Sequence, residues 1–120
     1  MTQHMDIPVA ASDWISSNDR HHRMDDAGRT KRLRQIAGLI ARRLRPVGKL
    51  SEVIAYVSYP TNRKADPPNA GPTLKAILDG IVDAGILDDD DSTHIRRTSF
   101  ERGPNTSTPQ HYSIRLEMIP

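Results

Sequence analysis

The sequence of 120 residues predicts an α/β fold: a single-domain, two-layer sandwich in which two helices cover one face of a mixed β-sheet. Two observations carry this prediction. Apolar residues recur at helical spacing in two segments, and β-branched or aromatic residues mark four short segments between them. A chain of this length can bury one core but not two, so we expect one domain over residues 1–120.

Four segments have the composition of strands. Residues 6–10 form a short apolar candidate, and the polar, turn-rich residues 11–29 after it indicate a long loop. Residues 51–60 are β-branched and aromatic and end at a proline. Residues 93–101 and 111–119 complete the set, and the last of these alternates apolar with polar residues.

The first helix is predicted from about Ala27, where the apolar spacing becomes helical. Asp25 or Asp26 can cap its start, and Pro46 and Gly48 end it. Its apolar face consists of Leu33, Ile36, Ala37, Ile40 and Leu44.

The second helix is predicted to begin at Pro72, after a loop at 61–72, and to stop at Gly85. Its apolar stripe consists of Leu74, Ile77, Leu78, Ile81 and Val82. The order of elements is therefore strand, helix, strand, helix, strand, strand.

Composition excludes several classes of site. There is no cysteine, so any metal must be held by Asp, Glu, Asn or His, which favours magnesium or manganese. No apolar run approaches the roughly 20 residues of a membrane span, and the N-terminus lacks the pattern of a signal peptide. We therefore expect a cytoplasmic protein with no membrane partner. Because only 36% of residues are hydrophobic, a homodimer is also expected.

Charge is spread unevenly along the chain. Residues 1–60 hold 10 Lys and Arg against 6 Asp and Glu, a balance of +4, whereas residues 61–120 hold 7 against 9, a balance of −2. The first half would attract a polyanion such as nucleic acid, and the second half a cation. The densest basic surface is the first helix, although a solvated helix face explains the same charges.

The stretch Asp88 to Asp91 places four carboxylates directly after the second helix. Such a run is locally unfavourable, because the charges repel and the helix C-terminus is itself negative. A solvated acidic turn is one interpretation. The other is a bound divalent cation, with Asp66 as a further ligand and Lys75 pointing at the same place.

Residues 65–95, ADPPNAGPTLKAILDGIVDAGILDDDDSTHI, resemble the signature of the RusA family of Holliday-junction resolvases. That signature contains an Asp-x-Asp-Asn, a lysine, a helix aspartate and a paired Asp-Asp before a strand. The matching residues are Asp66, Asn69, Lys75, Asp79, Asp89 and Asp90. Residues 17–23, 53–60 and 112–118 also resemble family segments, so the likeness extends over nearly the whole chain.

Two departures from the family pattern bear on the metal. Pro68 stands where the family has its second aspartate, and three extra residues separate Asn69 from Lys75. We hypothesise that the enlarged acidic run compensates for the carboxylate lost at position 68, with Asn69, Asp89 or Asp91 supplying the oxygen.

The resemblance implies a RusA-like, homodimeric, Mg²⁺- or Mn²⁺-dependent endodeoxyribonuclease that nicks four-way DNA junctions symmetrically in recombination and repair, with no small-molecule cofactor. It implies a phage or prophage origin. The implied catalytic residues are Asp66, Lys75 and Asp90. The candidate metal ligands are Asp66, Asn69, Asp89, Asp90 and Asp91. The candidate DNA-binding residues are Arg20, Arg23, Arg29, Lys31, Arg32 and Arg34.

Other interpretations stay open at this point. Pro68 favours a protein that binds junction or duplex DNA on the same fold without cutting it. A phage structural or regulatory protein leaves the charge asymmetry unexplained. His94 is interpreted as a residue of the strand surface, and His21 and His22 as loop residues near DNA rather than metal ligands. Trp14 and Phe100 are interpreted as core or interface residues.

Overall fold

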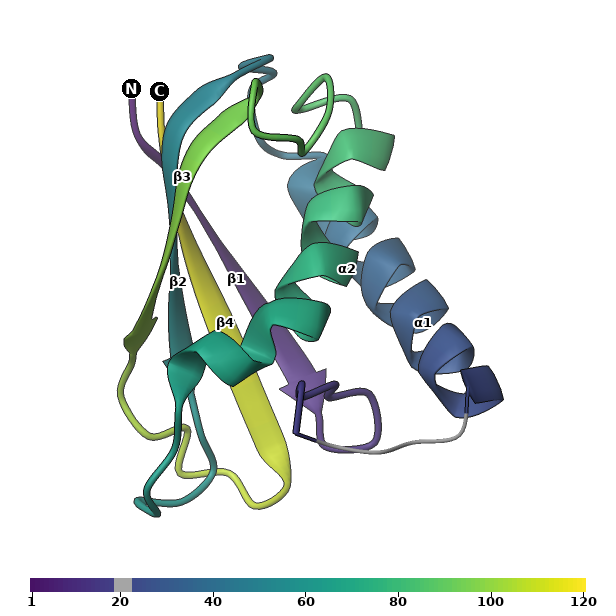
Figure 1. The fold of residues 1–120 in the computed structure, drawn as a ribbon, viewed down its shortest axis with the longest axis vertical. Helices are drawn as coiled ribbons and strands as arrows, with labels where there is room; N and C mark the ends of the chain where they lie inside the picture. Colours follow the sequence, from purple (N-terminus) through teal and green to yellow (C-terminus); the bar gives the residue numbers. More distant parts are fainter. Residues whose placement is uncertain (19–22) are drawn as a thin grey trace.

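A computed structural model of the chain, which describes residues 1–18 and 23–120, confirms the predicted α/β architecture (Figure 1). The strands are β1 (Gln3–Ala10), β2 (Leu50–Ser58), β3 (Ile95–Arg102) and β4 (His111–Ile119). The helices are α1 (Arg23–Ala41), the short 3₁₀ helix η1 (Pro67–Ala70) and α2 (Gly71–Asp83). Within the described ranges, no helix has the length and apolar character needed to cross a lipid bilayer.

The four strands form one mixed sheet in the order β1-β4-β2-β3. Strands β2 and β3 are parallel and are connected through η1 and α2, whereas β4 is antiparallel to both β1 and β2. The sequence offers the strand from Val53 to Tyr59 and the terminal strand as candidates for dimer contacts. Both are central in the sheet and paired on each side, so a partner chain could reach them only through a sheet face.

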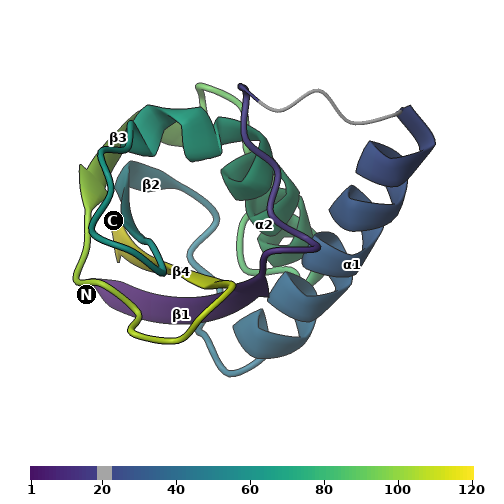
Figure 2. The same ribbon diagram turned by 90° about the horizontal axis from the view of Figure 1, so that it is seen from below.

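The core lies between the sheet and the helices, which cover the same face (Figures 1 and 2). Helix α2 lies against this face, and α1 packs mainly against α2 with further contacts to β1. Buried and more exposed residues alternate along β1, β2 and β4, as a half-covered sheet requires, whereas in β3 only Ile95 is buried. The buried strand residues are Met5, Ile7, Val9, Leu50, Val53, Ala55, Val57, Ile95, Ile114, Leu116 and Met118.

Helix α1 differs from its prediction at both ends. It begins at Arg23, so Asp25 and Asp26 lie in its first turn, where they face the positive end of the helix dipole. It ends at Ala41, because a continued helix would press the ring of Pro46 against the carbonyl four residues earlier. A tight turn follows, closed by the Leu44 amide, which donates to the Ala41 carbonyl at 2.9 Å.

The buried face of α1 contains fewer residues than the apolar face predicted from the sequence. Leu33, Ala37 and Ala41 are fully buried at intervals of four residues, whereas Ile36 is 38% exposed and Leu39 is 60% exposed. The predicted face therefore included Ile36, which the fold leaves exposed, and Ile40 and Leu44, which are only partly buried.

Helix α2 follows its prediction closely. The predicted loop before it contains η1, which two prolines at its first positions favour, and α2 begins one residue before Pro72. Its apolar stripe is buried from Leu74 to Ile81. The chain leaves the helix at Gly85, whose φ of +79° is a conformation that glycine adopts without strain.

The two helices approach most closely at Gly38 and Gly80. A Cβ atom added at Gly80 would lie 2.4 Å from the Arg34 carbonyl oxygen and 2.9 Å from the Ala37 Cβ. Glycine at position 80 is therefore what allows α1 to rest on α2 at this distance.

We expect Gly80→Ala to destabilise the protein by about 1–3 kcal/mol, because the added methyl group overpacks the helix contact. Gly71→Ala is the matched control, since a Cβ there would meet no atom within 4 Å and the backbone is already helical. Its free energy of unfolding should stay within about 0.5 kcal/mol of the unsubstituted protein. Urea denaturation measures both, and equal stability of the two variants would contradict the packing argument.

Candidate functional site

The acidic run lies in the loop that leads from α2 to β3 (Figure 1), and its four aspartates have different surroundings. The Asp88 amide donates to the Gly48 carbonyl at 3.2 Å, and its carboxylate is exposed. The Asp89 carboxylate accepts the Asp90 amide at 2.7 Å. Asp90 and Asp91 each bind a cationic or polar group, described below, so hydrogen bonds and one ion pair offset much of the repulsion within the run.

Lys75 connects α2 to this loop. Its Nζ lies 2.5 Å from Asp90 Oδ2 and 3.1 Å from Asp79 Oδ1. The Asp90 side chain is only 12% exposed, whereas that of Lys75 is 63% exposed. Folding therefore brings Lys75 into contact with two aspartates of the motif, which lie 4 and 15 residues after it in the sequence.

The ion pair fixes the protonation states of both groups. Hydrogen bonding to Asp90 raises the pKa of the Lys75 ammonium above its ordinary value, and Asp79 adds to this. Burial acts to raise the pKa of the Asp90 carboxyl, but the hydrogen bond and charge of Lys75 outweigh it, so the pKa is lowered. At neutral pH Lys75 is thus a cation and Asp90 a carboxylate.

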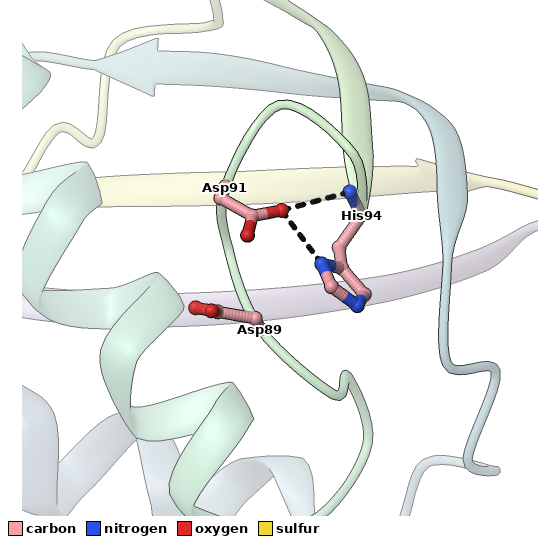
Figure 3. Close-up of side chains that lie close together, drawn as sticks. All are labelled: Asp89, Asp91 and His94. Carbon is pink, nitrogen blue, oxygen red and sulfur yellow. Dashed lines mark hydrogen bonds and ion pairs between the residues drawn. The ribbon is translucent and has the colours of Figure 1, made fainter.

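Asp91 organises the turn before β3. Its Oδ1 accepts the Thr93 hydroxyl at 2.7 Å and the Thr93 amide at 3.0 Å, and it lies 2.6 Å from His94 Nδ1 (Figure 3). These bonds, the Thr93 hydroxyl first, lower the pKa of the Asp91 carboxyl to about 2. Asp91 therefore has a clear structural role at the end of the loop.

A divalent cation fits one group of side chains in this loop by its donor chemistry. Asp89, Asp91 and His94 can each offer one ligand atom, and these atoms lie within 4.8 Å of one another (Figure 3). Two carboxylates suit Mg²⁺ or Mn²⁺, while an imidazole nitrogen is a donor more typical of transition metals, which favours Mn²⁺. Because Asp91 Oδ1 already accepts several hydrogen bonds, Oδ2 is its available ligand atom.

Asp66 and Asn69 lie elsewhere. Both line a pocket of about 450 Å³ at the other end of α2, which Lys75 and Asp90 do not line. The Asn69 side-chain oxygen accepts the Ser17 hydroxyl at 3.0 Å, so the atom that would bind a metal holds the loop at 11–18 instead. Neither Asp66 nor Asn69 belongs to the group of Asp89, Asp91 and His94, whose potential ligand atoms lie close together.

Three basic residues of α1, Arg29, Arg32 and Arg34, have partners within the protein. Arg29 donates to the Trp14 carbonyl at 2.8 Å, and Arg32 forms an ion pair with Asp13 at 2.6 Å. Arg34 pairs with Asp83 on α2 through two hydrogen bonds.

These contacts hold the loop at 11–18 and the two helices together. The Arg34 pair raises the pKa of the guanidinium and lowers that of the Asp83 carboxyl. The ion pairs of Arg32 and Arg34 also neutralise part of the positive charge that the sequence analysis assigned to DNA binding.

The other basic candidates differ in exposure. Lys31 is exposed on α1, and it forms no ion pair with another described residue. Arg42 and Arg43 share these two properties just beyond the helix. Arg20, with His21 and His22, lies outside the described residues, and for Arg23 only the backbone is described.

Two features went unnoticed in the sequence. His94 was interpreted as a strand-surface residue, yet its ring lies with Asp91, and the Asp-x-x-His spacing was a signal for this. The aromatic pocket, defined here by Trp14, Tyr59, Tyr112, Asp66 and Asn69, joins segments far apart in the chain. No local pattern could have indicated it. Trp14 is buried, as expected of a core residue.

Comparison of the sequence with protein-family models and with curated proteins finds no match. A function for this chain therefore has to be argued from its own residues.

We expect Asp91→Asn to unfold more easily than the unsubstituted protein at pH 5 to 7, measured by urea denaturation in EDTA. The lowered pKa means that the carboxylate contributes stability above its unfolded value of about 4 and loses it as the pH falls through about 2. The difference between the two proteins should therefore shrink between those pH values.

The control for this experiment is Asp88→Asn, which removes an equal charge from the same run without removing the bonds to Thr93 and His94. A stability difference for Asp91→Asn that stays constant down to pH 2 would contradict the role given to the carboxylate.

Proposed function

We propose that this chain is a metal-dependent endodeoxyribonuclease that resolves four-way DNA junctions, as its resemblance to the RusA family implies. The observation that carries the proposal is the contact of Lys75 with Asp90, a nearly buried carboxylate 15 residues further along the chain. These two residues occupy the positions of the family lysine and catalytic aspartate. Their contact supports the alignment on which the resemblance depends.

The protonation states suit phosphodiester hydrolysis. Lys75 stays charged at neutral pH, so its role is to stabilise negative charge on the phosphate or leaving oxygen rather than to accept a proton. Asp90 stays ionised beside it and can act as a ligand or as an acceptor for the attacking water.

The acidic loop would hold the metal through Asp89 and Asp91, with His94 as an additional donor, and the resemblance adds Asp90 as a further ligand. A bound Mg²⁺ or Mn²⁺ supplies a water of lowered pKa and neutralises a phosphate oxygen. Asp66 and Asn69 remain part of the proposal as ligands that a DNA-bound state would have to bring in, because they line a different pocket here.

The proposed partner is branched DNA, bound by a homodimer whose two sites match the two equivalent strands of a junction. Exposed Lys31, Arg42 and Arg43 support the electrostatic part of this binding. Apolar side chains exposed on α1, Ile36 and Leu39, are surface that a second protomer could cover. A cytoplasmic location in a bacterial host belongs to the same proposal.

A second candidate function is DNA binding without cleavage. Pro68 is exposed in η1, where the family has a carboxylate, and Asp66 is separate from the acidic loop. Such a protein would keep its electrostatic affinity for DNA and show no dependence on Mg²⁺ beyond ordinary salt screening.

A nicking assay on a synthetic four-way junction, in Mg²⁺, in Mn²⁺ and in EDTA, decides between these candidates. We expect paired nicks that require the metal, and a loss of about 100-fold or more in Asp90→Asn, because the carboxylate acts at the reacting phosphate. Asp88→Asn is the matched control in the same run and should cut normally.

The same preparations should be tested for junction binding. Asp90→Asn should bind as tightly as the unsubstituted protein. Tight binding with no nicking in either metal would overturn the nuclease proposal in favour of the second candidate.

The contribution of the basic residues is tested by the salt dependence of junction binding. We expect Lys31→Gln to lower the slope of log affinity against log salt by about one unit, as loss of one phosphate contact does. Arg34→Gln should chiefly lower the free energy of unfolding, since it removes the bidentate pair with Asp83. Fluorescence anisotropy measures the salt dependence and urea denaturation measures the stability. A lowered salt slope in Arg34→Gln together with an unchanged slope in Lys31→Gln would contradict these roles.

A further inference from the structure

The aromatic pocket is a formed cavity, and of its lining residues the proposed chemistry uses only Asp66 and Asn69. It lies between the loop at 11–18 and the segment from Tyr59 to Ala70. Trp14 and Tyr112 stack at a centroid distance of 4.3 Å with 9° between the ring planes. Tyr59 meets both rings edge-on, at 6.4 and 5.9 Å. These three of the chain's five aromatic rings thus form one cluster beside a cavity of about 450 Å³.

Hydrogen bonds fix the loop at 11–18, on one side of the pocket. The Thr73 hydroxyl, fully buried on α2, accepts the Ile15 amide at 2.9 Å and donates to the Ile15 carbonyl at 2.8 Å. The Ser17 amide donates to the Asn69 carbonyl at 2.9 Å. The loop is therefore tied to both η1 and α2.

Arg102 fixes the opposite wall. Its guanidinium lies 4.9 Å from the centroid of the Tyr59 ring and donates to the carbonyls of Thr61 and Arg63, at 3.0 and 2.8 Å. The pocket is consequently shaped before any ligand arrives, which lowers the entropic cost of binding.

The lining combines flat aromatic surface with charge and hydrogen-bonding groups. Tyr59 and Tyr112 are partly exposed, and the exposed cations Arg63 and Lys64 belong to the same lining, where they outnumber its one carboxylate, Asp66. A ligand that matches this set has a planar aromatic part and a nearby anion. A nucleotide has both, and the cavity is of the size of a small-molecule site.

We propose that the pocket binds one unpaired nucleobase of a DNA strand against Tyr59 and Tyr112, with the adjoining phosphate at Arg63 and Lys64. A paired base in a duplex has its faces covered by its neighbours, whereas an unstacked base can enter a concave aromatic site. This inference rests on the proposed function for the identity of the partner, and it adds that the bound DNA has an unpaired base.

The test compares two DNA ligands that differ only in that base: a duplex with one unpaired adenine, and the same duplex with an abasic residue in its place. Binding to the chain of 120 residues is measured by anisotropy in EDTA, which prevents cleavage. We expect the adenine ligand to bind about tenfold more tightly, as one base–aromatic contact gives. Fluorescence of Trp14, the single tryptophan, should change with the adenine ligand and not with the abasic one.

Three variants assign the effect to the pocket. Tyr59→Leu should reduce the adenine-to-abasic ratio to near one. A double variant, Arg63→Gln with Lys64→Gln, should weaken both ligands and leave the ratio unchanged, which keeps the test valid if Tyr59→Leu folds poorly. Arg115→Gln is the control, because Arg115 lies on β4 in an ion pair with Asp6, outside this pocket.

Equal affinity for the two ligands, or a ratio that persists in a folded Tyr59→Leu variant, would overturn the inference. Deoxyadenosine monophosphate should change Trp14 fluorescence far more weakly than the strand does; an equal or stronger response would replace the strand by a free nucleotide as the ligand. If the protein nicks junctions in a metal-dependent way but binds the adenine and abasic ligands equally, the pocket inference is wrong and the nuclease proposal stands. A tenfold ratio without nicking in either metal removes the nuclease proposal alone.

Discussion

The contact between α1 and α2 at Gly38 and Gly80 is the constraint on which the helical layer depends. A backbone carbonyl of α1 lies where a side chain of residue 80 would be, so the helices meet through main-chain atoms. This closeness places Arg34 within reach of Asp83 and lets Arg29 hold the loop that contains Trp14. The loop that carries Trp14, and with it one wall of the aromatic pocket, is thus held in part by α1.

The four aspartates after α2 are tolerated because they do not act as one charge cluster. Each has different neighbours, and two of them offset their charge through Lys75 and through the turn at Thr93 and His94. A run of like charge in a sequence therefore predicts neither a cation site nor a solvated turn by itself. What distinguishes the two is whether oxygen atoms remain free to bind a metal, as in Asp89 and at Asp91 Oδ2.

The sequence predicted the element order, the sheet type and most of the core, because strand alternation and helical spacing report burial directly. Its errors fall where tertiary contacts decide. Ile36 has the right spacing for the core, but the narrow contact with α2 leaves it partly exposed. Similarly, Arg32 and Arg34 looked available for DNA until folding brought Asp13 and Asp83 beside them. The motif placed Lys75 and Asp90 in one site without predicting their ion pair, whereas the pocket of Trp14, Tyr59 and Tyr112 depends on contacts between distant segments.

The central position of β4 has a consequence for the order of folding. This strand comes last in the chain, yet it separates β1 from β2 and supplies pairing partners to both. The α1–α2 layer and the parallel pair of β2 and β3 use residues that precede it, so they can form first. Strand β1 must wait for a partner more than 100 residues away, as in the pairing of Gln3 with Met118. Because closing so long a loop is slow, we expect the rate-limiting step of folding to be the pairing of β4 with β1 and β2.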